Sequence, residues 1–346
     1  MTEQKTANDA IFDLLILAGI DCSSFNVVSG DAGGNNRIDM VHAGSQTFVV
    51  KWYFSDARDK RDRLGTEWTF LEYAQKSGLE SVPAALARHP STPIALYEFI
   101  KGRKLEQSEI GIDEIKASAR FLAEINRKGD RDFAKHLPMA SEAYLNIQEH
   151  IDNVQRRFDR FEQVAEKYRS REGFSDLLSD LQNAWRSVQS SLVEAEQSGD
   201  IDILGKLEQA QLIISPSDFG FHNALKTDAG TLRFIDFEYA GWDDPAKTFA
   251  DFFLQPTVDV PLAYFDCFAQ EAGKEFPNLD KIIKRTKNLL PLFAIKWACI
   301  ILNPFVPEWA ARTKFANSDI DLRELQSKRL VAARDMIDKS HSLITL

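Results

Sequence analysis

Three side chains in one stretch of the sequence have the types and the order that phosphoryl transfer requires. Asp218 and Asn223 lie in the polar loop SPSDFGFHN, and Asp236 ends the apolar run that follows. Phosphoryl transfer needs a hydroxyl acceptor held in line with a phosphate, and Mg²⁺ to neutralise charge. A loop carboxylate can accept the hydroxyl proton, and amide and carboxylate oxygens are ligands that Mg²⁺ prefers. We therefore predict Asp218 as the catalytic residue, and Asn223 and Asp236 as the metal ligands.

The segment around these residues resembles the catalytic segment of the aminoglycoside phosphotransferase and choline kinase families, which are relatives of the protein kinases. The usual pattern in those families is His-Gly-Asp, four residues, Asn, and then a strand ending in Ile-Asp-Phe/Trp-Glu. This chain has Pro-Ser-Asp at 216–218, Asn223 after four further residues, Ile-Asp-Phe-Glu at 235–238 and Ala-Gly-Trp-Asp-Asp-Pro at 240–245. The spacing from Asp to Asn is weakly specific alone, whereas its combination with the later run is specific.

The resemblance implies both a fold and an activity. The expected fold is of the α+β class, a two-lobed protein-kinase-like fold. A small β-rich lobe over 1–100 would grip the nucleotide phosphates. A larger, mainly helical lobe over 101–346 would hold the catalytic loop, the metal and the acceptor, with a helical hairpin at about 141–195 shaping the acceptor site. The expected activity is transfer of the γ-phosphoryl group of ATP, with Mg²⁺ as cofactor, to a hydroxyl of a small molecule.

The N-terminal part of the sequence contains a candidate grip for the phosphates. Folds of this kind place a glycine-rich loop between the first two strands, where backbone can approach phosphates closely, and a lysine on the third strand. The glycines at the loop position are Gly30, Gly33 and Gly34. Lys51 lies in the third β-rich run. The resemblance implies a glutamate on the next helix that orients this lysine, with Glu67 as the first choice and Glu72 as the runner-up.

The run ALYEFIKG (95–102) resembles the hinge that holds adenine through backbone groups. Because backbone groups make the contact, the side chains at this place are not diagnostic. The candidates are Glu98, Phe99 and Ile100, and Gly102 follows them as it often does in the family.

The segment also departs from the family pattern. Pro216 takes the place of the usual His, with Ser217 as a further candidate contact to the acceptor, and a proline would stiffen the loop. His222 would contact a phosphate or the acceptor, or be a satisfied loop histidine. Thr248 stands where the family commonly has an Asp that braces the catalytic loop, and Asp251, about one helical turn later, is a candidate substitute.

Further acidic residues follow Asp236, the second predicted metal ligand. Glu238 is left open between supporting the metal site and facing the acceptor. Asp243 and Asp244 are expected to fix the turn before Pro245. Together these carboxylates would attract a cationic acceptor such as an amino sugar or a choline-like amine. Sugars, amino alcohols and hydroxylated amino acids are left open as acceptors too.

The elements that must position these residues follow from periodicity and turn signals. Apolar spacing predicts a helix over 9–20 that ends at Gly19, and another over 65–78 that ends at Gly78. The strands predicted from alternation and turn residues are 25–30, 37–44, 46–54, 85–89 and 94–102. The later helices predicted from apolar spacing are 113–128, two amphipathic stripes in the hairpin, and a buried helix over 289–302.

Composition excludes several classes of protein. The chain has 346 residues, 44% hydrophobic and 27% charged, and a net charge of −10. That charge disfavours non-specific binding to nucleic acid or anionic lipid, so the expected partner is a small-molecule acceptor. The cysteines, Cys22, Cys267 and Cys299, form no Cys-x-x-Cys pair. Together with the absence of an N-terminal signal pattern, this predicts a cytoplasmic protein with reduced thiols.

Two other function classes remain open at this stage. The changes at Pro216 and Thr248 favour a nucleotide-binding pseudokinase with a regulatory or scaffold role. A protein that binds no nucleotide and works through its helical hairpin is the third class, and it would gain no thermal stability from Mg·ATP.

Overall fold

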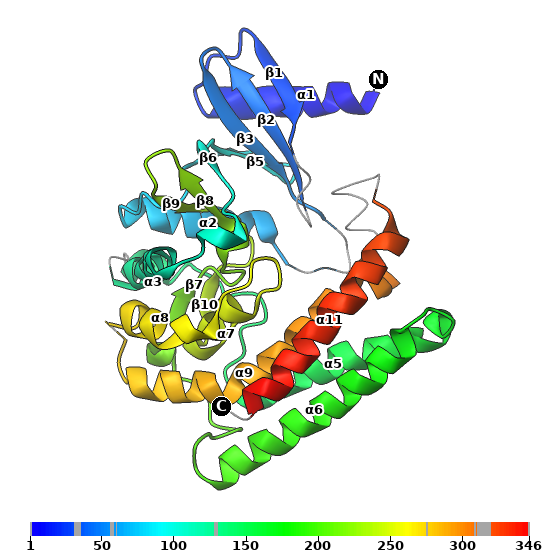
Figure 1. Cartoon of the computed structure of the whole chain (residues 1–346). Helices are drawn as coiled ribbons and strands as arrows, with labels where there is room; N and C mark the ends of the chain where they lie inside the picture. The colour runs from blue at the N-terminus through cyan, green and yellow to red at the C-terminus, as the bar shows by residue number, and fades with distance from the viewer. Residues whose placement is uncertain are drawn as a thin grey trace.

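A computed structural model describes residues 2–30, 36–55, 59, 61–127, 131–274, 276–307, 309 and 320–344. It has a small antiparallel sheet at one end and a larger helical part at the other (Figure 1). The strands of this sheet, in spatial order, are β1 (Phe25–Ser29), β2 (Arg37–Ala43), β3 (Gln46–Trp52), β5 (Ile94–Glu98) and β4 (Ala85–Arg88). This is the α+β arrangement with a β-rich and a helical lobe that the sequence predicted.

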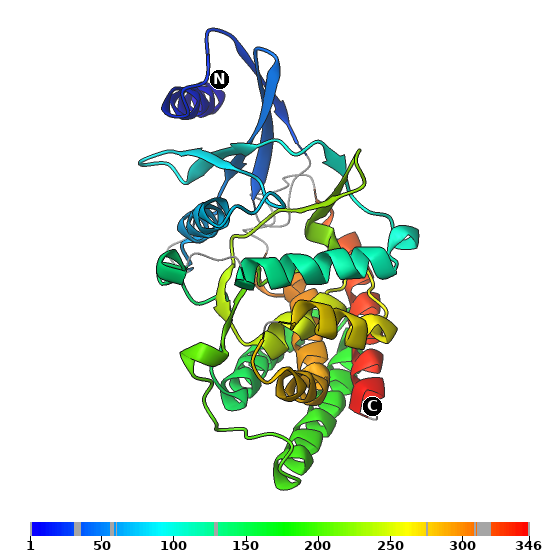
Figure 2. The same ribbon diagram turned by 90° about the vertical axis from the view of Figure 1, so that its left-hand side faces the viewer.

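Two helices cover the two faces of the sheet. Because side chains alternate along a strand, Ile94 and Leu96 of β5 face α1 (Thr2–Leu17), whereas Ala95 and Tyr97 pack in the other cluster with α2 (Arg63–Lys76). Figure 2 shows α1 and α2 on either side of the β4–β5 hairpin. On β3 the same alternation turns Lys51 away from α1 and toward α2.

Short strands carry the catalytic segment. Strand β8 (Ala224–Thr227) pairs with β9 (Leu232–Phe234) and with β6 (Gly102–Arg103), so one small sheet joins the chain after β5 to the segment around 224–234. Strand β7 (Ile213–Ser215) pairs with β10 (Gly241–Asp243). These two pairings bring the two ends of the catalytic segment together.

Helices form most of the remaining chain. They are α3 (Ile112–Arg127), α4 (Arg131–Ala134), α5 (Ile147–Ala165), α6 (Phe174–Gln197), α7 (Pro245–Leu254), α8 (Phe265–Ala272), α9 (Leu279–Ile301) and α11 (Leu322–Ile344). Single 3₁₀ turns are η1 (Gln107–Glu109), η2 (Glu166–Tyr168), η3 (Gln209–Gln211), η4 (Phe221–Asn223), η5 (Leu262–Tyr264) and η6 (Asn303–Phe305). Helix α9 is packed in one apolar cluster with α5, α6, α7 and α11, and within the described residues no helix is long and apolar enough to cross a membrane.

Three predicted elements differ from the structure, one of them the helix expected over 289–302, which begins earlier, at Leu279. The strand expected over 94–102 ends at Glu98, and the chain resumes as β6 only at Gly102, because β6 pairs with β8 rather than with the large sheet. The helix expected over 9–20 begins at Thr2. Its first turns contain mostly polar residues, which carry no apolar stripe but have no strong bias against helix.

Candidate functional site

Lys51 lies at the centre of a buried cluster of carboxylates. Its Nζ is 2.6 Å from Glu67 Oε2 and 2.5 Å from Asp236 Oδ1. Burial opposes the charge on Lys51, but Asp236, Glu67 and Glu238 raise its pKa well above the usual value. The lysine therefore stays cationic and joins α2 to the end of the catalytic segment. Glu67 was the first choice for this contact, and Glu72 does not make it in the described structure.

The backbone around Asp236 is held by the same glutamate. The amide of Phe237 donates to Glu67 Oε1 at 3.2 Å, and Tyr53 donates to Glu67 Oε2 at 2.7 Å. Asp236 itself has φ of 69°, a left-handed conformation that a non-glycine residue adopts at some cost. The Phe237 ring stacks on Phe70 of α2 at 4.4 Å between centroids. These contacts fix the direction of the Asp236 carboxylate.

Asn223 and Asp236 are brought together by backbone pairing. The amide of Ile235 donates to the carbonyl of Asn223 at 2.9 Å, immediately beyond the β8–β9 pair Ala224–Phe234. The Asn223 Nδ2 donates to the carbonyl of Asp218 at 3.0 Å. Because the amide nitrogen is used in this way, the side-chain oxygen is the atom left to ligate a cation.

The residues present fit Mg²⁺ rather than an all-protein metal cage. Among the residues that the structure describes, no group of three or more His, Cys, Asp or Glu could hold a metal ion. Mg²⁺ is typically bound through one or two protein oxygens together with substrate phosphates and waters. Asn223 and Asp236 supply two hard oxygen donors of this kind, with Lys51 beside them for phosphate oxygens.

Asp218 lies in a tight loop before η4. Its amide donates to the carbonyl of Pro216 at 2.9 Å, and its Oδ1 is 3.1 Å from His222 Nε2. Burial opposes the charge on Asp218, yet the contact with His222, the bond with Asn223 and the charge of Lys247 keep its pKa below the usual value. The carboxylate is therefore ionised at neutral pH, as a proton acceptor must be. His222 pairs with this carboxylate.

This pKa predicts the acid side of the pH–rate profile. Since the pKa of Asp218 is lowered from 3.8, its protonation should cause no loss of turnover between about pH 5 and 8. Replacing His222 with Gln removes one source of the lowering, so the acid limb should move to higher pH. Profiles of kcat/KM for both proteins measure the shift. A wild-type acid limb near pH 6 that the His222→Gln protein leaves in place would contradict the assignment.

Thr248 braces the catalytic loop through a chain of hydroxyls. Its Oγ1 donates to Ser215 Oγ at 2.9 Å, and Ser215 Oγ accepts from the amide of Ser217 at 3.0 Å. Ser217 has φ of 65°, so its backbone needs such support. The suggestion that Asp251 replaces the missing brace is wrong, because Asp251 ion-pairs with Lys247 and Lys296 and reaches the loop only through Lys247, which donates to Ser217 Oγ at 3.4 Å.

Removal of the Thr248 hydroxyl should therefore loosen the loop. The Thr248→Val protein leaves the buried Ser215 hydroxyl short of a partner, and we expect a loss of about 1–3 kcal/mol in the free energy of unfolding. Thr231→Val, in an exposed turn, is the matched control and should change stability by less than about 0.5 kcal/mol. Urea unfolding of the three proteins measures both values. Equal stability of the Thr248→Val protein and the wild type would show that the hydroxyl chain is dispensable.

Glu238 faces the lysine rather than the acceptor. It is buried, accepts from Asn36 Nδ2 at 2.5 Å and lies 3.9 Å from Lys51 Nζ and 3.8 Å from Arg63 Nε. Burial raises the pKa of Glu238, a shift that Lys51 opposes. The sequence left open whether Glu238 supports the metal site or faces the acceptor, and these contacts favour the first interpretation. Asn36 carried no sequence signal, because its partner lies 202 residues away.

The other sequence candidates lie where the loop and the hinge were expected, as far as they are described. At Gly30 a Cβ would lie 3.2 Å from the carbonyl oxygen of Ile38, whereas Gly33 and Gly34 lie outside the described residues. The amide of Glu98 donates to Ala84. The amides of Phe99 and Ile100 have no hydrogen-bond partner in the described part of the chain. Asp244 caps α7 by accepting from the amide of Ala246, as expected for the turn before Pro245.

A cavity of about 330 Å³ opens beside Asp218. Its lining combines Ser217, Asp218 and His222 with aromatic and cationic side chains. These include Arg61, Arg157, Lys247, Lys296 and Arg329, and the indoles of Trp297 and Trp309. Most of these lining residues come from helices that are distant in sequence, so the sequence carries no signal that they meet. The exception is the pairing of Lys247 with Asp243 and Asp251, which follows from helical spacing.

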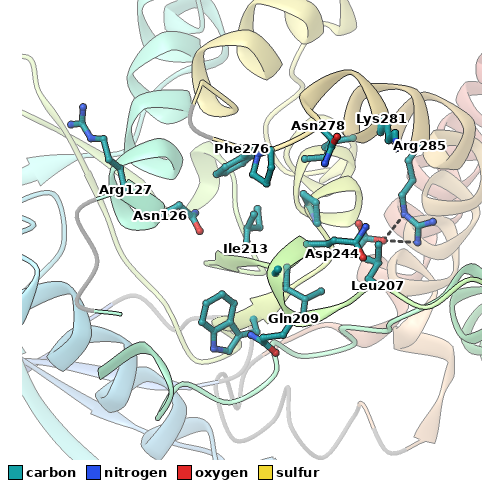
Figure 3. Close-up of a pocket in the computed structure, with 17 residues that line it drawn as sticks. Asn126, Arg127, Leu207, Gln209, Ile213, Asp244, Phe276, Asn278, Lys281 and Arg285 are labelled. Carbon is teal, nitrogen blue, oxygen red and sulfur yellow. Dashed lines mark hydrogen bonds and ion pairs between the residues drawn. The ribbon is translucent and has the colours of Figure 1, made fainter. Parts of the chain in front are cut away.

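A separate cavity of about 550 Å³ lies behind the β7–β10 pair (Figure 3). Asn126, Ile213 and Phe276 line it, together with the ion pair of Arg285 and Asp244 at 2.8 Å. None of Lys51, Asp218, Asn223 and Asp236 lines this cavity, so it does not belong to the candidate active site.

Comparison with solved structures identifies the fold. A spectinomycin phosphotransferase, solved with ADP and spectinomycin, matches with a TM-score of 0.62 and 13% identity over 94% of this chain and 97% of that one. The chain has the fold of small-molecule kinases. The choline kinase of Cryptosporidium parvum has a TM-score of 0.59 at 13% identity over 96% of each chain, and that of Streptococcus pneumoniae has 0.57 at 14% over 98% and 100%. No family model matches this kinase-like chain, and no curated protein matches its sequence.

Proposed function

We propose that this protein is an ATP-dependent phosphotransferase that moves the γ-phosphoryl group to a hydroxyl of a small molecule. The observation that carries the proposal is the convergence of Lys51, Glu67 and Asp236 within hydrogen-bond distance across two parts of the chain. Burial of a lysine between carboxylates costs desolvation free energy and is weak as a source of stability. A role in phosphate binding gives a reason for the cluster. Similar folds in a spectinomycin phosphotransferase and choline kinases support the same class of reaction.

Each residue of the site has a separate role in the proposed transfer. The bond between the γ-phosphorus and the bridging oxygen of ADP breaks, a bond from the acceptor oxygen to phosphorus forms, and the acceptor proton moves to the Asp218 carboxylate. Lys51, oriented by Glu67, binds the α- and β-phosphates. Asn223 and Asp236 would hold Mg²⁺, which when bound neutralises charge on the phosphate oxygens. Gly30 lies near the phosphates.

Two further features belong to this proposal. The backbone at Glu98, Phe99 and Ile100 holds the purine, because two of its amides are free of partners within the described chain. Three free cysteines suit a reducing compartment such as the cytoplasm.

Two measurements test the function. Calorimetry with Mg²⁺ and a non-hydrolysable ATP analogue reports nucleotide binding, and acceptor-dependent release of ADP across anionic, neutral and cationic alcohols reports transfer. Binding together with transfer supports the proposal. If the protein binds nucleotide but neither hydrolyses ATP nor transfers phosphate to any of the three classes of alcohol, a pseudokinase is favoured. If it binds no nucleotide, both the phosphotransferase and the pseudokinase interpretation are wrong.

A further inference from the structure

A second cavity of about 610 Å³ lies next to the cavity beside Asp218. The two share Arg61, Glu142, Arg157, Asn303 and Trp309 in their linings. An acceptor that places its hydroxyl at Asp218 therefore has room to extend along α5 toward this second cavity.

The described lining of these two neighbouring cavities has more cationic than acidic side chains, although the chain as a whole carries a net charge of −10. The cationic side chains are Arg61, Arg156, Arg157, Arg160, Lys247, Lys296 and Arg329, and the acidic ones are Glu142, Asp159, Asp218 and Asp251. Positive charge is thus in excess at the place where the acceptor must lie, which opposes the charge of the whole molecule.

Internal ion pairs account for only part of this positive charge. Lys247 pairs with Asp243 and Asp251, and Lys296 pairs with Asp251. Arg61 is held by Asp59 through two nitrogens at 2.8 Å. These pairs neutralise the lysines, whereas Arg157 on α5 and Arg329 on α11 are less completely matched among the described residues.

Arg157 of α5 is one of the incompletely matched cations. It is 8% exposed, and one end of its guanidinium pairs with Glu142. Its Nε is buried without a hydrogen-bond partner among the described residues. A buried donor without a partner has lost its hydration without gaining a hydrogen bond, and a ligand oxygen would supply that bond.

Arg329 of α11 is the second. It lines the same cavity as Asp218, and no hydrogen bond or ion pair joins it to any residue that the structure describes. Burial lowers its pKa, and among the described residues no carboxylate forms an ion pair with it. A half-buried guanidinium with its planar donors unused suits an incoming carboxylate or phosphate, which it can bind through two parallel hydrogen bonds.

From this arrangement we infer that the acceptor is an anionic alcohol, with a phosphate or carboxylate group held by Arg157 and Arg329 while its hydroxyl lies at Asp218. The inference rests on the proposed phosphotransferase function and names the substrate class of that site. It reverses the expectation of an amino sugar or choline-like amine, because positive charge is in excess in the described lining of this cavity.

The first experiment measures anion binding apart from turnover. With the nucleotide site filled by Mg²⁺ and a non-hydrolysable ATP analogue, inorganic phosphate is titrated by calorimetry. We expect saturable binding that weakens about 10- to 100-fold in the Arg329→Gln protein, the loss of one charge-assisted contact. Lys328→Gln, the neighbouring residue on α11, removes the same charge outside the cavity and should leave phosphate binding as it is.

The second experiment measures turnover with sugar phosphates, hydroxy acids, uncharged sugars and choline as acceptors. We expect the highest kcat/KM in the anionic group, and a rise in acceptor KM with the Arg329→Gln change. Turnover of choline or amino sugars, with no phosphate binding and no effect of Arg329→Gln, would overturn the inference and leave the proposed function intact. Arg329-dependent phosphate binding without any transfer would support the anion site and defeat the proposed function instead.

Discussion

The Asp218→Asn protein should transfer phosphate about 10²- to 10⁴-fold more slowly than the wild type, with nucleotide affinity little changed. The range is that expected for loss of a general base, and the amide cannot take the proton from the acceptor hydroxyl. The change keeps the size of the side chain, and the loop contacts made by the Asp218 backbone survive it. Steady-state kcat for transfer and calorimetry with Mg²⁺ and an ATP analogue measure the two quantities.

A matched control separates this effect from a general loss of negative charge. Asp228 lies in the exposed β8–β9 turn, where its side chain is 77% exposed and pairs with Lys101 at the surface. The Asp228→Asn protein should keep its kcat within about twofold. Unchanged turnover after Asp218→Asn, with Asp228→Asn also silent, would remove Asp218 from the catalytic role.

Replacing Lys51 with Met should affect both activity and folding. The change leaves Glu67, Asp236 and Glu238 close together without the cation that now lies among them. Breaking a buried ion pair from one side costs about 3–5 kcal/mol of folding free energy. Loss of a preorganised charge at the phosphates should lower kcat by about 10²- to 10³-fold. Urea unfolding and transfer kinetics measure the two losses, and Lys101→Met, at an exposed site, is the control.

A second variant and a pH series test whether unpaired charge causes the loss of stability in the Lys51→Met protein. Adding Glu67→Gln to Lys51→Met removes one of the stranded charges, so the double variant should be more stable than Lys51→Met alone. The pKa of Glu238 is already raised by burial, so its stability contribution is present at low pH and is lost as pH rises through that pKa. The Lys51→Met protein should therefore be destabilised less at pH 5 than at pH 8. A pH-independent loss would point to packing instead.

Sequence reasoning predicted the local elements well where short-range signals exist. Alternation and turn residues placed β1, β2 and β3 within two residues of their observed ends, and Gly78 marked the end of α2. It could not predict that the strand over 94–102 divides, because that division depends on β6 pairing with β8, more than 100 residues later. The prediction of α1 began too late because the residues of its first turns carry no apolar pattern.

The same distinction between local and distant signals applies to the site. Asp218, Asn223 and Asp236 could be singled out because a short loop and a hairpin hold them in fixed order. The support given by Asn36 to Glu238, and the approach of Arg157 and Arg329 to the acceptor cavity, depend on the packing of helices far apart in the chain. No periodicity or motif reports such contacts. The expectation of a cationic acceptor came from acidic residues counted along the sequence. The charge of the cavity depends instead on which side chains face it, and the described lining has more cationic than acidic ones.

The central claim, that side chains from both parts of the chain meet one metal–nucleotide complex, has a direct structural test. Crystals grown with Mn²⁺ in place of Mg²⁺ and a non-hydrolysable ATP analogue would locate the ion by its anomalous scattering. The account predicts a peak bound by the Asn223 and Asp236 side-chain oxygens and by phosphate oxygens, with Lys51 Nζ on the α- and β-phosphates. An ion bound elsewhere, or a nucleotide that leaves Lys51 untouched, would contradict it.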